Sequence, residues 1–96
     1  MNIQILTPAK IDISSGADFY ECQSQGLGHY FLNTIFSDIE SLRIYCGVHI
    51  KIENYYRLLS KRFPYAIYYK YNNETVYIYA VLDTRSNPVY VNERLS

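Results

Sequence analysis

The second part of the sequence concentrates side chains suited to binding a partner. From Tyr55 onward the chain holds nine of its 12 tyrosines. The same stretch carries six basic residues against three acidic ones, for a net charge of +3, whereas residues 1–54 have a net charge of −3. A phenol ring beside a cation combines a large apolar surface, a hydroxyl and positive charge, which are properties of binding hot spots. We therefore expect the binding surface in this half of the chain.

The alternation of residues predicts how these tyrosines divide between two sheet faces. "AIYYKY" and "TVYIYAVL" are typical of paired strands, and "NNE" between them predicts a tight turn at either Asn73–Glu74 or Asn72–Asn73. This pairing predicts a core face made of Ile67, Tyr69, Tyr71, Val76, Ile78, Ala80 and Leu82. An open face would then carry Tyr68, Lys70, Tyr77 and Tyr79. Tyrosine also suits any half-solvated sheet surface, but the neighbouring positive charge favours a binding face.

A strand and two helices are expected to precede this hairpin. "IQIL" at 3–6 predicts a strand, after which Thr7 would cap a helix that has Pro8 in its first turn and ends near Gln23. Its inward stripe is Ala9, Ile13, Ala17 and Tyr20, with Gly16 costing about 1 kcal/mol of helix stability. The second helix shows the clearest period, through Phe31, Leu32, Ile35, Ile39, Leu42 and Cys46, and Gly47 would end it. Gly26 and Gly28 in "QGLG" are assigned to the connection.

The rest of the chain completes an α+β pattern. "YYRLLSK" predicts a strand and "RFPY" a turn before the hairpin, while Asn87 and Pro88 predict the start of a short final helix. The order predicts an N-terminal strand, an α-helical hairpin packed on a mainly antiparallel β-sheet, and a short C-terminal helix. At 96 residues we expect a single domain over residues 1–96.

Composition narrows the functional classes. A net charge of zero argues against an obligate nucleic-acid binder, and no apolar run reaches the ~18 residues of a membrane helix. The N-terminus lacks signal-peptide character, so we expect a cytoplasmic protein. Cys22 and Cys46 fall at opposite ends of the helical hairpin, which argues against a disulfide and favours a role as small apolar fillers. His29 and His49 lack metal-ligand spacing, so no metal and no cofactor are expected.

Three motifs resemble the RelE/ParE toxins of bacterial type II toxin–antitoxin systems. They are Tyr20-x-x-Gln23-x-x-Gly26-Leu27-Gly28-x-x-Phe31 between the helices, "KRFPYAIYY" at 61–69 and "VLDTRSNP" at 81–88. Together they extend over most of the chain in the family's order. The resemblance implies a helical hairpin on a sheet whose other face is a basic groove, and a cognate antitoxin protein as partner.

The resemblance also implies one of two activities. Some members cleave ribosome-bound mRNA without a metal, and others inhibit DNA gyrase by protein contact. We expect cleavage as the leading hypothesis, with gyrase inhibition or an inactive remnant that only binds its antitoxin as alternatives. Plasmid stabilization is a further role implied by the family.

Cleavage would need a base, a cation for the phosphorane and a proton donor. By resemblance, the catalytic candidates are Lys61, Arg62, Arg85 and Tyr90, with Lys61 as base and Arg85 as phosphate clamp. The antitoxin- or target-binding face would comprise Tyr68, Lys70, Tyr77, Tyr79 and Arg94. Family members often have His where this chain has Asp83, and a carboxylate there would repel phosphate unless it pairs with Arg85 or Arg62.

Overall fold

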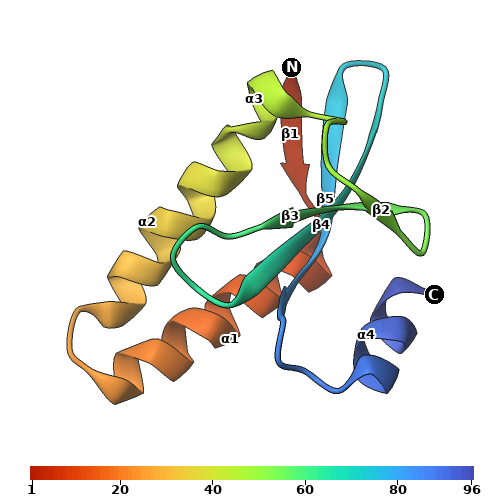
Figure 1. Ribbon diagram of the computed structural model, residues 1–96. Coiled ribbons are helices and arrows are strands. Elements are labelled where there is room, and N and C mark those ends of the chain that lie inside the picture. The colour runs from red at the N-terminus through yellow and green to blue at the C-terminus, as the bar shows by residue number, and fades with distance from the viewer.

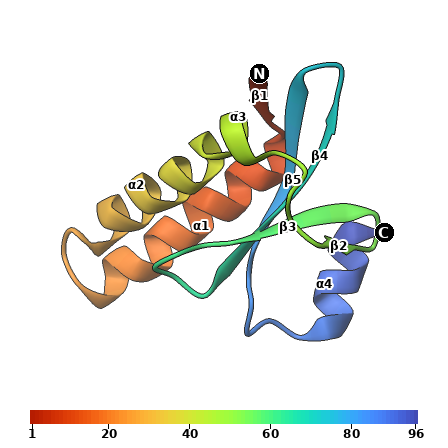
Figure 2. The same cartoon turned by 45° about the horizontal axis from the view of Figure 1, so that its top comes forward.

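A five-stranded sheet lies between two helical layers of unequal size. The computed structural model describes residues 1–96. The helices are α1 (Thr7–Gln23), α2 (Leu27–Glu40), α3 (Leu42–Tyr45) and α4 (Pro88–Leu95). The strands are β1 (Asn2–Ile5), β2 (Lys51–Ile52), β3 (Tyr55–Leu59), β4 (Tyr65–Asn72) and β5 (Thr75–Asp83). Figures 1 and 2 show α1 and α2 side by side on one side of the sheet and α4 on the other. The α+β prediction is confirmed.

The sheet has the strand order β1-β5-β4-β3-β2. β1 runs parallel to β5, and the other three pairs are antiparallel. The β4–β5 turn uses Asn73 and Glu74, whose φ angles of 49° and 64° fit a two-residue hairpin. Of the two turns left open by the sequence, the first is therefore the one that forms. None of the helices is long and apolar enough to cross a membrane.

The main core lies between the α1–α2 hairpin and the sheet. The first predicted helical stripe, Ala9, Ile13, Ala17 and Tyr20, is buried. In the second, Phe31, Ile35, Ile39 and Leu42 are buried, whereas Leu32 and Cys46 are half-buried at its edge. Gly16 has a packing role that its helix propensity does not reveal. A Cβ atom there would lie 2.6 Å from Cζ of Phe31. The missing side chain therefore makes room for the Phe31 ring against α1.

The glycines between α1 and α2 have different roles. Gly26, with φ of +89°, is the residue before α2 and allows the chain to reverse. Gly28 was assigned to the connection, and that assignment is wrong: it lies inside α2, where a Cβ would approach the Ala17 carbonyl oxygen to 2.6 Å. The Glu21 carboxylate accepts hydrogen bonds from the backbone N–H of Gly26 and of Gly28, each at 3.0 Å, and these bonds lower the pKa of Glu21.

The second predicted helix is divided at Ser41. The Ser41 hydroxyl donates to the Asp38 carbonyl at 2.6 Å, and the Ile44 N–H donates back to Ser41 over three residues, so the period tightens and α3 begins. Gly47, with φ of +90°, ends α3 as predicted. Two further predictions were wrong. Thr7 does not cap α1, because it is itself the first residue of the helix and no side chain caps that end. Cys22, expected to be a small apolar filler, is exposed.

Leu42 links the end of the hairpin to the core and is fully buried. We expect Leu42→Ala to lower the free energy of unfolding by about 2 to 4 kcal/mol, because it leaves a cavity in a closely packed region. Urea denaturation followed by circular dichroism measures this loss. Ile44→Ala is the matched control, since Ile44 is 79% exposed in the same short helix. A Leu42→Ala loss below about 0.5 kcal/mol would contradict the packing.

A bulge in β5 corrects the predicted division of its residues. Tyr68 pairs with Ala80 but Tyr69 pairs with Ile78, so Tyr79 is an extra residue in the strand. Beyond it the faces exchange: Val81 joins the main core, while Ala80 and Leu82 join a second cluster on the opposite face. The assignment of Ala80 and Leu82 to the main core was wrong. Tyr71 was also wrongly placed in the core, because it is 44% exposed near the hairpin end.

Candidate binding face

The sheet face opposite the α1–α2 hairpin, here called the open face, carries a lysine held between two tyrosine rings. The Lys70 ammonium lies 4.5 Å from the ring centroid of Tyr55 and 5.5 Å from that of Tyr79. The two rings meet edge to face, with centroids 5.0 Å apart. Cation–π attraction fixes the position of the ammonium while leaving its charge available to a partner. Tyr77, which pairs with Lys70 across the strands, is half-buried.

Tyr55 was missed by the sequence interpretation. Tyr55 directly follows the Glu53–Asn54 turn between β2 and β3. The two-residue strand β2 was not predicted from the sequence either. β3 pairs with β4, with Arg57 opposite Tyr68, so Tyr55 and Arg57 share the open face. Counting alternate residues back along "YYRLLSK" from a β3–β4 pairing would have identified both residues.

Helix α4 covers part of the open face, and it is formed by the terminal residues, the one part of the chain that the sequence left to cover this face. Tyr68 is only 5% exposed and belongs to a cluster with Ala66, Ala80, Leu82 and Leu95. Its predicted place on an exposed surface was wrong, because α4 folds back over it. The accessible part of the open face is thus reduced to the region of Lys70 and the edge beside α4.

Arg85 and Asp83 form a closed ion pair after β5. The Asp83 carboxylate accepts from the Arg85 backbone N–H at 2.7 Å, from Nε at 3.0 Å and from Nη2 at 2.7 Å. These bonds from Arg85 lower the pKa of Asp83, and the carboxylate in turn raises the pKa of Arg85. Of the two partners considered for Asp83, Arg85 and Arg62, the structure has Arg85. The same contact partly compensates the positive charge that Arg85 would offer a phosphate.

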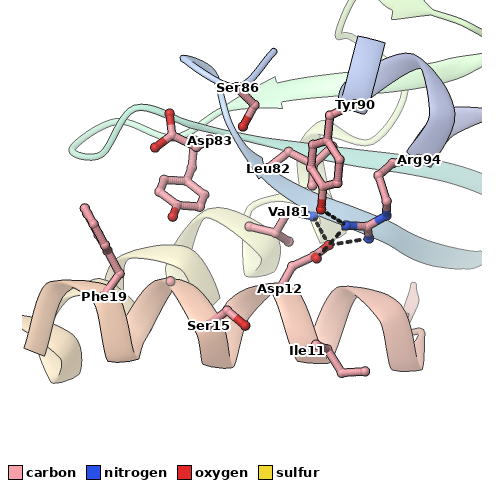
Figure 3. Close-up of a pocket in the computed structure, with 12 residues that line it drawn as sticks. Ile11, Asp12, Ser15, Phe19, Val81, Leu82, Asp83, Ser86, Tyr90 and Arg94 are labelled. Carbon is pink, nitrogen blue, oxygen red and sulfur yellow. Dashed lines mark hydrogen bonds and ion pairs between the residues drawn. The ribbon is translucent and has the colours of Figure 1, made fainter. Parts of the chain in front are cut away.

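Tyr90 and Arg94 of α4 line a pocket of about 420 Å³ between α1, β5 and α4 (Figure 3). Arg94 donates from Nη1 and Nη2 to the two oxygens of the Asp12 carboxylate, at 2.8 and 2.7 Å. It also donates to the Tyr90 hydroxyl at 2.9 Å. The Asp12 carboxylate also accepts a hydrogen bond from the backbone N–H of Val81 at 3.0 Å. Val81 lies in β5 beyond Ile78, whose pairing with Ile5 is the last between β1 and β5. The predicted binding residue Arg94 thus fastens α4 to α1.

Lys61 and Arg62 lie in the β3–β4 loop and line a different hollow, with residues of α2. Arg62 donates to the Tyr30 hydroxyl at 2.9 Å, and its guanidinium lies 5.9 Å from that ring centroid. Lys61 forms no ion pair. The hollow is lined by Tyr30, Asn33, Thr34, Ser37, Asp38, Lys61 and Arg62. The catalytic candidates are therefore divided between this hollow and the Tyr90 pocket, whose lining includes Asp83, the partner of Arg85.

Comparisons with known proteins identify the fold. No family model matches the sequence, and no curated protein matches it either. A solved chain of the chromosomal ParDE toxin–antitoxin (TA) system from P. aeruginosa superposes with a TM-score of 0.72. The match covers 84% of this chain and 92% of that chain at 14% sequence identity. The protein therefore has a ParE/RelE-like α+β fold, with a helical hairpin on one face of its sheet.

Proposed function

We propose that the protein is the toxin of a type II toxin–antitoxin module and that its partner is a cognate antitoxin. The observation that carries this proposal is the fold shared with a chain of a ParDE system over nearly its whole length. The three sequence motifs of the RelE/ParE family, in their expected order, support the same assignment. The antitoxin would neutralise the protein by covering the part of the open face around Lys70.

The arrangement of the cations favours action by protein contact over RNA cleavage. Arg85 is paired with Asp83 and Arg94 with Asp12, so a carboxylate already compensates part of the charge of each guanidinium before a phosphate approaches. Lys61, the candidate base, lines a different hollow from Tyr90. Proton transfer requires base, donor and cation around one reacting group. We infer inhibition of DNA gyrase through the open face, with cleavage of ribosome-bound mRNA as the second candidate.

Two purified assays distinguish these mechanisms. With gyrase and supercoiled plasmid, the contact mechanism predicts trapped cleaved complexes that appear as linear DNA after protease treatment. With translating ribosomes, it predicts intact mRNA in primer extension. Cuts in the ribosomal A site without any effect on gyrase would reverse the order of the two candidates. No effect in either assay from folded protein would favour the remnant that only binds its antitoxin.

Arg85→Ala is expected to abolish growth arrest on induction without unfolding the protein. The Arg85 side chain is 62% exposed, so its ion pair contributes little to stability, and we expect the melting temperature to change by less than about 3 °C. Removing the arginine leaves the Asp83 carboxylate unpaired beside the open face, where it would repel an acidic target. Growth curves at equal expression measure the effect.

Arg43→Ala is the matched control for this variant. Arg43 also forms an exposed ion pair, with Glu40 at 2.8 Å, but at the α2–α3 end of the molecule. We expect Arg43→Ala to arrest growth like the unaltered protein. Arrest by Arg85→Ala at equal protein level would remove Arg85 from the site.

A further inference from the structure

Arg57 holds an N–H group that nothing in the chain satisfies. Its Nε is the one buried side-chain nitrogen or oxygen that lacks a hydrogen-bond partner. Arg57 is in the middle of β3, opposite Tyr68, and its side chain lines a small pocket between the open face and α4. Nε itself has almost no accessible surface, so a ligand in the pocket would meet the two terminal nitrogens of this guanidinium, which form no hydrogen bond or ion pair and are not buried. A carboxylate bound there would give the Arg57 charge the partner that the chain does not supply.

The charge in the pocket specifies an anion. A guanidinium presents a planar fork of donors that matches the two oxygens of a carboxylate. Asp83 also lines the pocket, but both of its oxygens already accept hydrogen bonds from Arg85. The internal carboxylate is therefore engaged elsewhere and leaves Arg57 free. Ser86 and Asn92, also in the lining, add polar groups at the mouth.

The size and walls of the pocket suit one short side chain of a protein. Its volume is about 260 Å³, and Ile52, Pro88 and Val91 contribute apolar surface beside Arg57. The methylene groups of glutamate would pack on these walls while its carboxylate reaches the guanidinium. An RNA strand fits less well, because its affinity depends on many phosphate contacts and this pocket offers one unpaired cation.

We propose that this pocket binds a glutamate side chain of a protein partner, with the carboxylate on the Arg57 guanidinium and the stem against Ile52 and Val91. The inference rests on the proposed toxin function in one respect, namely that the antitoxin is the partner. The antitoxin must then carry an acidic residue in the segment that crosses the edge of α4.

Titration with sodium propionate tests the pocket without the partner. Propionate carries a carboxylate on a short apolar stem, and ¹⁵N-labelled protein reports each arginine Nε–H separately by NMR. We expect the Arg57 Nε–H signal to move downfield and saturate with a dissociation constant on the order of 10 mM. The Arg62 signal is the internal control and should stay in place, since Arg62 already donates to Tyr30. Neutral propionamide should produce no such shift.

Variants and a second ligand make the result decisive. In Arg57→Gln, whose amide spectrum reports that it is folded, the propionate-induced shifts around Ser86 and Asn92 should disappear, and Arg57→Lys should weaken them by about threefold or more because the fork is lost. A non-saturating Arg57 signal, or the same shifts in Arg57→Gln, would overturn the proposal. Tighter binding of a short RNA at Arg57 than of propionate would overturn it in favour of a phosphate site. Because the titration needs no toxicity, its failure and that of the proposed function are separable.

Discussion

Phe31→Ala is expected to lower the free energy of unfolding by about 3 to 5 kcal/mol, enough to unfold a marginal domain. Phe31 is fully buried at the centre of the main core. Its ring centroid lies 5.3 Å from that of Tyr20, 5.1 Å from Phe63 and 4.9 Å from Tyr65. One substitution therefore removes aromatic contacts to α1, to the β3–β4 loop and to β4 together.

Urea denaturation of purified protein measures this loss, with Phe36→Ala as the matched control. Phe36 lies in the same helix but is 44% exposed, so its removal should cost less than about 1 kcal/mol. Similar losses from the two variants would mean that α2 presents a different side to the sheet.

Asp12→Ala is expected to cost about 3 to 5 kcal/mol, because it leaves the Arg94 guanidinium and the Val81 N–H without their acceptor. The Asp12 side chain is 10% exposed and that of Arg94 is 23% exposed, so water can compensate only in part. The loss should appear first as detachment of α4, which would expose Tyr68. Tyrosine fluorescence and urea denaturation report the two events.

The exposed Glu40–Arg43 pair supplies the control for Asp12. Glu40→Ala removes a carboxylate that is 60% exposed, and it should change the free energy of unfolding by less than about 0.5 kcal/mol. Asp12→Ala combined with Arg94→Met should recover part of the lost stability, since no unpaired charge then remains buried. A double variant no more stable than Asp12→Ala would show that the uncompensated charge is not the source of the loss.

The helical hairpin was predictable because its signal is local. Apolar residues at spacings of three and four define one helix face whatever packs on it, and Phe31, Ile35 and Ile39 are buried as predicted. The turn between β4 and β5 was predicted to within one residue, since Asn tolerates positive φ, but that preference favours Asn72–Asn73 over the Asn73–Glu74 turn that forms.

The open face was harder to predict, because a bulge and a distant helix shape it. A bulge inserts one extra residue, so every residue beyond it points to the opposite sheet face from the one that simple alternation predicts. This happens after Tyr79. The run Ala80-Val81-Leu82 was a signal, because three successive buried residues require cover on both faces. The burial of Tyr68 depends on α4, and the Asp12–Arg94 contact that holds α4 joins residues 82 positions apart.

Growth after induction in bacteria that lack the antitoxin tests the toxin proposal most directly. The measurement is the number of colony-forming units after induction of the protein alone and after co-induction with the reading frame next to its gene. We predict that the protein alone stops colony formation, and that the neighbouring frame restores it by forming a complex that co-purifies with the protein. Unchanged colony numbers with folded protein accumulating in the cells would contradict the proposal.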